Sequence, residues 1–216
     1  MDPFLQHRQT FEELLDRFDQ NAALELTAQW LANGEMTVPA LYEKILAPSL
    51  NRIHIPRGEE PCAIWKEHIQ TAIVRSVVES AHPYVVRARP AGPAKGKVLL
   101  ACPEEEYHDL GARMGADFFA LAGFDPLFIG SNTPTACILN AAAQVRPALL
   151  VLSVTNNLNL PALKKIVQAL HIVQPDTRLY LAGSALAHLQ ESPKDWGASG
   201  VIASYADVMA LGEVTA

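Results

Sequence analysis

The sequence is poor in cysteine, in basic charge and in long apolar runs, and each shortage excludes a class of protein. Its three cysteines, Cys62, Cys102 and Cys137, are too few and too scattered for a disulfide framework, so we expect small buried side chains in a reducing compartment. Seventeen Lys and Arg against 23 Asp and Glu give a net charge of −6, which disfavours direct binding of nucleic acid. No apolar run reaches the ~18 residues of a membrane span, and the first residues lack the layout of a signal peptide. We therefore expect a soluble, cytoplasmic protein without a membrane partner.

The composition predicts a packed hydrophobic core, because half of the 216 residues are hydrophobic and only 19% are charged. The pattern changes along the chain. It predicts a helical bundle over 1–81, a linker rich in proline and glycine over 82–96, and an α/β domain over 97–216.

The first region holds four apolar-periodic segments with short connections, which predict a four-helix bundle. Thr10 and Glu13 have the spacing of a capping box at the start of the first segment. Thr37 is placed to cap the third segment. Pro48 lies inside that third segment, where we expect it to bend or break the helix.

The second region alternates short apolar runs with segments of helical period. Runs of this kind occur at 97–102, 126–130, 148–154, 179–183 and 200–204, and the helical segments lie at 111–123, 135–145, 160–170 and 185–190. Strands alternating with helices predict a parallel sheet, here a doubly wound, five-stranded, flavodoxin-like (Rossmann-like) α/β domain. Such sheets bind ligands beyond the carboxyl ends of their strands.

The loop after the first predicted strand carries the motif E-x-H-x-x-G, formed by Glu106, His108 and Gly111, with Asp109 between them. A histidine on such a loop can present a ring nitrogen to a ligand, and a carboxylate two residues earlier can hold the other ring N–H and set the tautomer. The glycine permits close approach of the backbone. By itself the motif is also compatible with a solvated loop histidine.

Two further loops fall at the same edge of the predicted sheet. Forty-one residues separate Gly111 from Ser153, which ends the third strand, and Thr155 follows two positions later. Twenty-six residues then separate Thr155 from the pair Ala182-Gly183, which ends the fourth strand. A histidine, a hydroxyl group and a pair of small residues thus meet at one edge.

This spacing resembles the cobalamin-binding domain family, whose pattern is D-x-H-x-x-G, about 40 residues, S-x-L, a shorter interval, and G-G. Three positions depart from that pattern. Glu106 stands where the family has Asp, Thr155 stands for Leu, and Ala182 stands for the first Gly.

The resemblance implies a role for each residue of the pattern. His108 would be the lower axial ligand of cobalt, in place of the cofactor's own benzimidazole base, and Glu106 would be its hydrogen-bond partner. Ser153 and Thr155 would line the slot for the detached nucleotide tail. Gly183 would keep the path of that tail clear of side chains.

The helical region resembles one branch of this family more closely. Glu67-His68, followed by IQTAIV, is similar to the E-H pair of the CarH-type light-sensing cobalamin regulators. The E-x-H-x-x-G variant and the segment FIGSNTP (128–134) point to the same branch. The resemblance implies that the bundle caps the upper face of the cofactor and that His68 binds cobalt from above after light breaks the cobalt–carbon bond.

Ile64, Glu67, His68 and Thr71 are spaced to form one stripe along a helix, which the resemblance places toward the cofactor. A wet edge of the bundle is the alternative reading of this stripe. The branch carries a Trp well before the E-H pair, whereas Trp65 here lies two residues before Glu67. A contact with the cofactor and a core or interface position both stay open for Trp65.

The resemblance predicts a cobalamin sensor that binds adenosylcobalamin or methylcobalamin, responds to light through its oligomeric state, and is not itself an enzyme. Regulators of this type usually carry an N-terminal DNA-binding domain, whereas this sequence starts with the bundle. The sequence is therefore interpreted either as a truncated sensor or as a sensor that signals through a transcription regulator or another partner protein. We also expect it to form a homo-oligomer. Two alternatives remain. The chain could be a corrinoid methyl carrier of a methyltransferase system, or a module for another tetrapyrrole such as a bilin or haem.

Overall fold

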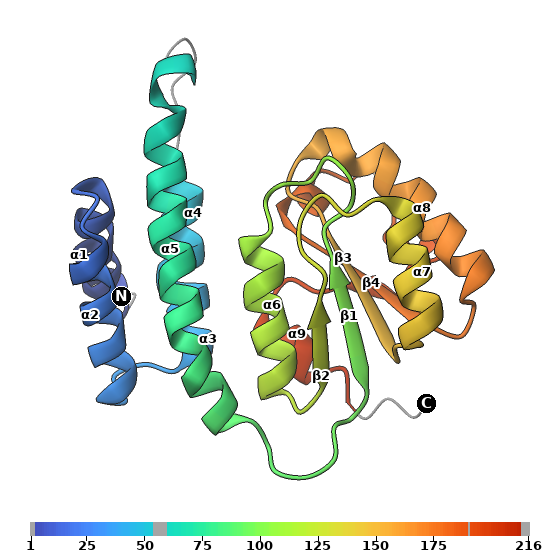
Figure 1. Cartoon of the computed structure of the whole chain (residues 1–216), viewed down its shortest axis with the longest axis horizontal. Helices are drawn as coiled ribbons and strands as arrows, with labels where there is room; N and C mark the ends of the chain where they lie inside the picture. The colour runs from blue at the N-terminus through green and yellow to red at the C-terminus, as the bar shows by residue number, and fades with distance from the viewer. Residues whose placement is uncertain (1–2, 54–59, 190, 213–216) are drawn as a thin grey trace. The chain divides into compact units, whose positions relative to one another are not determined.

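The computed structural model describes residues 3–53, 60–189 and 191–212, and it does not describe the side chains of residues 60–62 and 188. The chain forms two compact units, Met1–Ala88 and Arg89–Ala216, and each is considered by itself (Figure 1). The first unit is helical and the second is an α/β domain, as the sequence predicts.

The described residues of the first unit form four helical segments. They are α1 (Leu5–Asp16), α2 (Gln20–Ala32), the continuous run α3 (Val38–Ala40), η1 (Leu41–Leu46) and α4 (Ala47–Arg52), and α5 (Glu60–Ala88). Large apolar side chains from these segments are fully buried together, among them Phe11, Leu15, Tyr42 and Ile73. Tyr42 also donates its hydroxyl hydrogen bond to the carbonyl of Val78 across the core.

The predicted helix caps are half right. Thr37 caps α3, because its side chain accepts a hydrogen bond from the N–H of Ala40. The predicted capping box at Thr10 is wrong: α1 starts five residues earlier, at Leu5, and the Thr10 hydroxyl donates to the carbonyl of Gln6 inside the helix.

Pro48 does not break the third segment. The turn before it, Leu41–Leu46, is a π-helix, in which the N–H of Ala47 bonds to the carbonyl of Tyr42 five residues back. A proline in a regular α-helix clashes with the carbonyl four residues earlier, and a wider π turn relieves that clash. The segment therefore stays helical to Arg52.

The linker is shorter than the sequence predicts. Residues 82–88 belong to α5, which continues through Pro83 to Ala88. Ala81 and Val85 are fully buried on either side of Pro83, so packing of the helix outweighs the local cost of the proline. The chain then enters the second unit at Arg89, whose guanidinium donates to the carbonyl of Phe124.

The second unit is built on a parallel sheet of five strands in the order β2-β1-β3-β4-β5, which is the flavodoxin-like order. The strands are β1 (Lys97–Ala101), β2 (Asp125–Phe128), β3 (Leu149–Ser153), β4 (Arg178–Ala182) and β5 (Gly200–Val201). All five residues of β3 are buried, as expected for a central strand covered on both faces. The register places Ala101 beside Leu152 and Ser153 beside Ala182, so the first, third and fourth strands end together.

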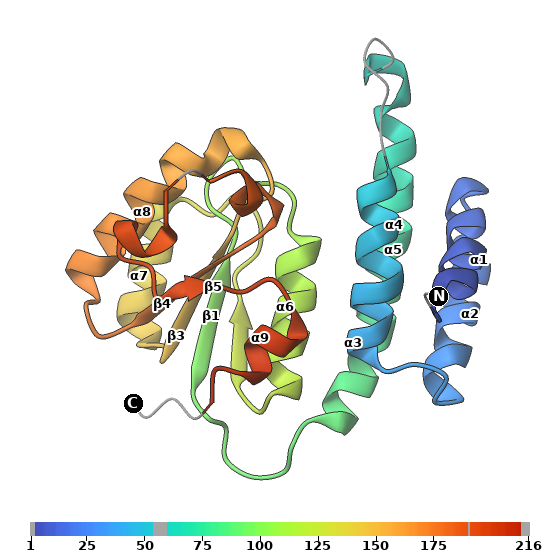
Figure 2. The same cartoon turned by 180° about the vertical axis from the view of Figure 1, so that it is seen from behind.

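Helices cover both faces of this sheet, as Figures 1 and 2 show. The α-helices are α6 (Leu110–Leu121), α7 (Thr135–Val145), α8 (Leu160–Val173) and α9 (Tyr205–Met209), and the 3-10 turns are η2 (Asn157–Asn159), η3 (Ser184–His188) and η4 (Pro193–Trp196). Side chains of α7 and α8 form one buried cluster with β1, β3 and β4. Where the sequence predicts a helix over 185–190, the structure has the 3-10 turn η3, and residue 190 lies outside the described residues.

The cysteines follow the prediction in part. Cys102 is buried, but Cys137 is exposed on α7, and the side chain of Cys62 lies outside the described residues. Among the described helices, none combines the length and the apolar character that crossing a membrane requires.

Candidate functional site

The loop after β1 places the predicted histidine and carboxylate in direct contact. Nδ1 of His108 lies 2.7 Å from Oε1 of Glu106. Glu106 is completely buried, whereas the side chain of His108 is 62% exposed. A carboxylate at this distance accepts the Nδ1–H, so the tautomer that the contact favours keeps its lone pair on Nε2. The contact thus fixes one ring nitrogen and leaves the other available as a ligand.

The carboxylate of Glu106 also joins this loop to the loop after β3. Oε1 accepts a second hydrogen bond from the N–H of His108. Oε2 accepts from the backbone N–H groups of Thr155 and Asn156, both at 2.9 Å, and from the side-chain amide of Asn159 at 3.2 Å. A buried charge needs such a set of donors. Glu106 therefore connects the loops that follow β1 and β3.

These donors determine the ionisation of Glu106. Burial by itself raises the pKa of a carboxyl group, but the N–H groups of Asn156, His108 and Thr155 and the imidazole of His108 favour the charged form. Burial and these hydrogen bonds together lower the pKa of Glu106 below its ordinary value. The carboxylate consequently remains an acceptor for Nδ1–H at neutral pH.

The backbone of the histidine loop is held in an unusual conformation. Glu105 has a φ of 66° and Asn132 a φ of 48°, both in the left-handed region. The two residues are tied together, since the N–H of Glu105 donates to Oδ1 of Asn132 and the N–H of Asn132 donates to the carbonyl of Glu106. Non-glycine residues persist in this region only where their surroundings hold them. Contacts on both sides of the loop therefore fix the position of His108.

Cys102 lies next to the site but is not a candidate ligand. Its thiol contacts the carbonyl of His108 at 3.9 Å. Burial, followed by the negative charges of Asp109 and Glu106, raises the pKa of the Cys102 thiol to about 12. Because the thiolate is the form that binds metals, Cys102 stays out of any metal chemistry at neutral pH.

The other residues of the motif lie at the start of α6. Asp109 is the N-cap residue, half-buried, and its side chain makes no capping hydrogen bond. Gly111 is exposed in the first turn, and a Cβ added to it meets no atom within 4 Å. The close approach that the sequence predicts at Gly111 stays a prediction, and the space beside this residue is open.

Ser153 and Thr155 flank the end of β3. Ser153 is buried as the last residue of the strand, and Thr155 is exposed. The backbone N–H of Thr155 supports Glu106, a role that the sequence does not predict.

The packing of the backbone around position 183 requires a glycine there. Its φ is 102°, and a Cβ would lie 2.1 Å from the carbonyl oxygen of Val154. The turns after β3 and β4 are therefore packed backbone to backbone at this point. Close packing between the two turns requires a glycine here, whether or not a ligand passes by.

Glu67 and His68 of the bundle also form a contact pair. Oε2 of Glu67 lies 3.4 Å from Nε2 of His68, and Oε1 accepts a hydrogen bond from the Thr71 hydroxyl at 2.8 Å. The His68 side chain is 71% exposed, and that of Glu67 is 32% exposed. The polar members of the predicted stripe thus lie on a solvent-accessible part of α5.

Trp65 and Ile64 are large apolar side chains that the helical unit leaves partly uncovered. Trp65 is 49% exposed and Ile64 is 45% exposed. The indole ring of Trp65 packs against Phe18, with ring centroids 5.6 Å apart. Trp65 is therefore a half-exposed aromatic at the edge of the helical core.

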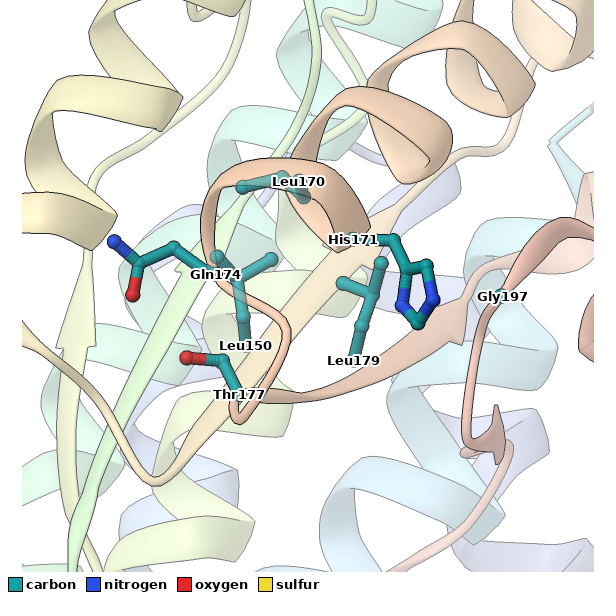
Figure 3. Close-up of a pocket in the computed structure, with 7 residues that line it drawn as sticks. All are labelled: Leu150, Leu170, His171, Gln174, Thr177, Leu179 and Gly197. Atoms are coloured by element: carbon teal, nitrogen blue, oxygen red, sulfur yellow. The ribbon is translucent and has the colours of Figure 1, made fainter.

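One pocket of the α/β unit lies away from these residues (Figure 3). It is lined by Leu150, Leu170, His171, Gln174, Thr177, Leu179 and Gly197, where α8 ends and β4 begins. Its volume of about 10 Å³ admits a single water molecule. It is at the amino ends of the strands, opposite to the edge that carries His108, and it has no room for a cofactor.

Sequence reasoning misses the asparagines that complete the site. Asn132, Asn156 and Asn159 all make side-chain hydrogen bonds in its loops. Three asparagines within 155–159, directly after a buried strand, are a signal for side chains that bond to backbone. Asn156 bonds within its own loop, whereas the partners of Asn132 and Asn159 belong to another loop, which local spacing does not identify.

Comparison with known proteins agrees with this geometry. Residues 96–209 match the B12 binding domain family. The HTH-type transcriptional repressor CarA of Myxococcus xanthus is 29% identical over 122 residues, which cover 56% of this chain and 39% of that protein. The monomethylamine corrinoid protein of Methanosarcina barkeri has a similar structure, with a TM-score of 0.77, 16% identity and coverage of 96% of this chain and 97% of the other.

The match to the family spans more than half of the chain, which therefore belongs to the B12-binding domain family. Cobalamin is the cofactor of this family. The site fits it, because the loop after β1 offers an exposed imidazole with a fixed Nδ1–H and an open Nε2, as a cobalt ligand requires. The chain spans well under half the length of the repressor, and the likeness to the corrinoid protein shows a shared fold.

Proposed function

We propose that this chain is a cobalamin-binding sensor module in which Nε2 of His108 is the lower axial ligand of cobalt. The observation that carries the proposal is the contact between Nδ1 of His108 and the buried carboxylate of Glu106 within a B12-binding domain. Such a partner fixes the ring orientation and raises the basicity of the ligand nitrogen.

The remaining residues of the edge are proposed to receive the rest of the cofactor. Ser153 and Thr155 line the slot for the nucleotide tail, and Gly111 leaves room for its approach. Tyr107 is 61% exposed and Leu158 is 84% exposed, one on each of the two loops that Glu106 connects. Exposed apolar side chains beside the ligand are surface that a large macrocycle can cover.

We further propose that light is the signal and that the output is regulation of transcription, through a change of oligomeric state or through a partner protein. Support comes from the sequence similarity to a transcriptional repressor and from the Glu67–His68 pair. An alkylcobalamin supplies a cobalt–carbon bond that visible light breaks. In this proposal, the exposed imidazole of His68 is a second nitrogen that can bind cobalt, and Ile64, Trp65 and Glu67 are its neighbours along α5.

The cofactor assignment is tested by loading and spectroscopy. Protein mixed in darkness with adenosylcobalamin or methylcobalamin and then desalted is expected to retain the corrinoid with a nitrogen-coordinated spectrum. The His108→Ala variant is expected to lose that spectrum or to lose the cofactor. The control is His171→Ala, which removes an imidazole beside the small pocket at the opposite edge of the sheet. Wild-type protein that retains no corrinoid, or that prefers haem or a bilin under the same conditions, overturns the assignment.

The light response is tested on the loaded protein by light scattering before and after green illumination. A change of mass or of association with a candidate regulator is expected for the wild type, together with a spectral change that His68→Ala alters. Identical mass and association in darkness and light contradict the sensor proposal while leaving cobalamin binding intact.

A corrinoid methyl carrier is the second candidate function. It is favoured by the similarity in fold to the monomethylamine corrinoid protein over nearly the whole of both chains. In that role, the loaded protein passes methyl groups between partner methyltransferases. Methyl transfer from the loaded protein in a reconstituted system, without any effect of light on its mass, favours this candidate over the sensor.

A further inference from the structure

We infer that Asn132, in the loop after β2, is a positioning residue for His108, because it holds the turn that leads into the histidine in a left-handed backbone conformation. The inference rests on the proposed function, since it concerns the imidazole that is proposed to bind cobalt. It brings a third loop of the sheet edge into the site, and it does not involve the carboxylate of Glu106.

The turn that leads into the histidine has an unusual third residue. The N–H of Glu106 donates to the carbonyl of Pro103 at 3.0 Å and closes a four-residue turn over 103–106. Glu105 is the third residue of this turn, with a φ of 66°. A turn with a positive φ at this position ordinarily has glycine or asparagine there, because a Cβ makes the conformation costly. The side chain of Glu105 is exposed, so contacts of the backbone must hold the turn.

Asn132 supplies two such contacts. Its Oδ1 accepts from the N–H of Glu105 at 2.9 Å, and its own N–H donates to the carbonyl of Glu106 at 2.8 Å. The two hydrogen bonds hold the peptide groups on either side of the pair 105–106. Glu105 cannot return to a negative φ without separating at least one of these donors from its acceptor. Because His108 follows two residues after Glu106, the same turn sets the direction in which the chain reaches the imidazole.

Asn132 can hold the turn because its own loop is supported on both sides. The N–H of Cys102 donates to the carbonyl of Gly130 at 2.9 Å, and the N–H of Thr133 donates to the carbonyl of Cys102 at 3.0 Å. Residues 131–132 therefore bulge out between two backbone hydrogen bonds that extend the pairing of β1 with β2. Asn132 has a φ of 48°, which asparagine tolerates better than most residues. Its amide is thus presented to the turn by a fixed backbone.

The chain permits variants that separate the side-chain contact from the backbone conformation. Asn132→Gly permits the positive φ at residue 132 and removes Oδ1. Ser131→Ala is the matched control, because Ser131 is exposed in the same bulge and its side chain makes no hydrogen bond within the described part of the chain. Glu105→Gly removes the cost of the positive φ that Asn132 supports. Thermal unfolding checks each variant, and Asn132→Ser, whose shorter side chain withdraws the acceptor, serves if Asn132→Gly does not fold.

The experiment measures the ratio of nitrogen-coordinated to uncoordinated cofactor by absorption, in protein loaded with cobalamin. In Asn132→Gly we expect this ratio to fall about tenfold, as for other residues that support a metal-binding histidine. Ser131→Ala is expected to match the wild type. In the Glu105→Gly background, Asn132→Gly is expected to lower the ratio only about twofold, because glycine adopts a positive φ without the cost that glutamate has.

A second readout uses the cofactor-free protein. The N–H of Glu105 is the group that Oδ1 of Asn132 accepts from, so its hydrogen exchange reports the contact directly. In Asn132→Gly we expect exchange at this amide to become about tenfold faster, and in Ser131→Ala we expect the wild-type rate. Unchanged exchange in Asn132→Gly would show that the side chain does not hold the turn, and would overturn the inference.

The outcomes separate this inference from the proposed function. If His108→Ala abolishes coordination and Asn132→Gly leaves the ratio unchanged, the inference is wrong and the proposed function stands, even where Asn132→Gly lowers the unfolding temperature. A loss of coordination that is equally large in the Glu105→Gly background also overturns the inference, since Asn132 then acts by a route other than this turn. If His108→Ala leaves coordination unchanged, the proposed function itself fails.

Discussion

Glu106 is a fully buried carboxylate with five hydrogen bonds, from the backbone and ring of His108, the backbone of Thr155 and Asn156, and the amide of Asn159. It is therefore a structural anchor as well as a partner for the imidazole. His108, by contrast, is mostly exposed and is held by Glu106 without holding the loop itself. The two residues of one motif should thus respond to substitution in different ways.

Glu106→Ala is expected to lower the free energy of unfolding of the cofactor-free protein by about 3 kcal/mol, because it leaves several buried donors without an acceptor. His108→Ala is expected to cost less than about 1 kcal/mol, because its side chain is exposed and Glu106 keeps its other donors. Urea denaturation of both variants measures the difference. Equal losses in the two variants would show that the carboxylate has no structural role beyond the histidine.

Gly183→Ala is expected to destabilise the α/β unit by at least about 2 kcal/mol, even without cofactor. The reasons are the positive φ and the clash of the new Cβ with the carbonyl of Val154. Gly111→Ala is the matched control, since its Cβ enters open space. Thermal unfolding of the two variants compares them, and a stable Gly183→Ala protein would return Gly183 to a role in ligand binding alone.

At the scale of single residues, the sequence predicts contacts that are short along the chain and misses those that are long. Glu106 and His108 are two residues apart, so a loop geometry that joins them follows from the motif. Asn159 lies 53 residues from Glu106, and only the register of β1 beside β3 brings them together. The same limit applies to the link between Glu105 and Asn132.

At the scale of elements, strands were easier to predict than helix ends. Each predicted strand overlaps an observed one, and β3 is the clearest case, because a strand buried on both faces appears as an unbroken apolar run. The errors in the helices, at Thr10 and Pro83, are places where packing decides the boundary. Phe11, Leu15 and Val85 are fully buried there, and their burial extends helices across local signals to stop or start.

The start of helix α9 depends on the carboxylate of Asp207. Ser204 and Asp207 form a capping box at the start of α9, with the Ser204 side chain accepting from the N–H of Asp207. The N–H of Ala203 and then the hydroxyl of Ser204 hold the pKa of Asp207 below its ordinary value of 3.8. Asp207→Asn is expected to cost about 1 kcal/mol at neutral pH.

The sign of the pH dependence follows from the lowered pKa. A carboxyl group with a lower pKa in the folded state stabilises the fold above its ordinary pKa, and that contribution is lost as the pH falls through the folded value. The difference in unfolding free energy between the wild type and Asp207→Asn should therefore be constant near neutrality and shrink below about pH 4. Asp176→Asn, at an exposed position before β4, is the control. A difference that grows toward acid pH would contradict the assignment.

At the scale of the whole molecule, two compact units follow one another along the chain, and the second carries the match to the B12-binding domain family. The order of a helical unit and a flavodoxin-like unit could be predicted from the sequence, since the change from helical to alternating patterns is strong. The finer function could not be derived in the same way, because one fold can serve different functions.

The proposed function depends on one coordinate bond, from Nε2 of His108 to cobalt. Electron paramagnetic resonance of protein loaded with the cobalt(II) form of cobalamin measures it directly, because the ligand nitrogen splits the cobalt lines. Labelling the protein's histidines with ¹⁵N is expected to change that splitting from a triplet to a doublet, and His108→Ala is expected to remove the protein-derived doublet. A triplet that labelling leaves unchanged would mean that the cofactor keeps its own base, and would contradict the account.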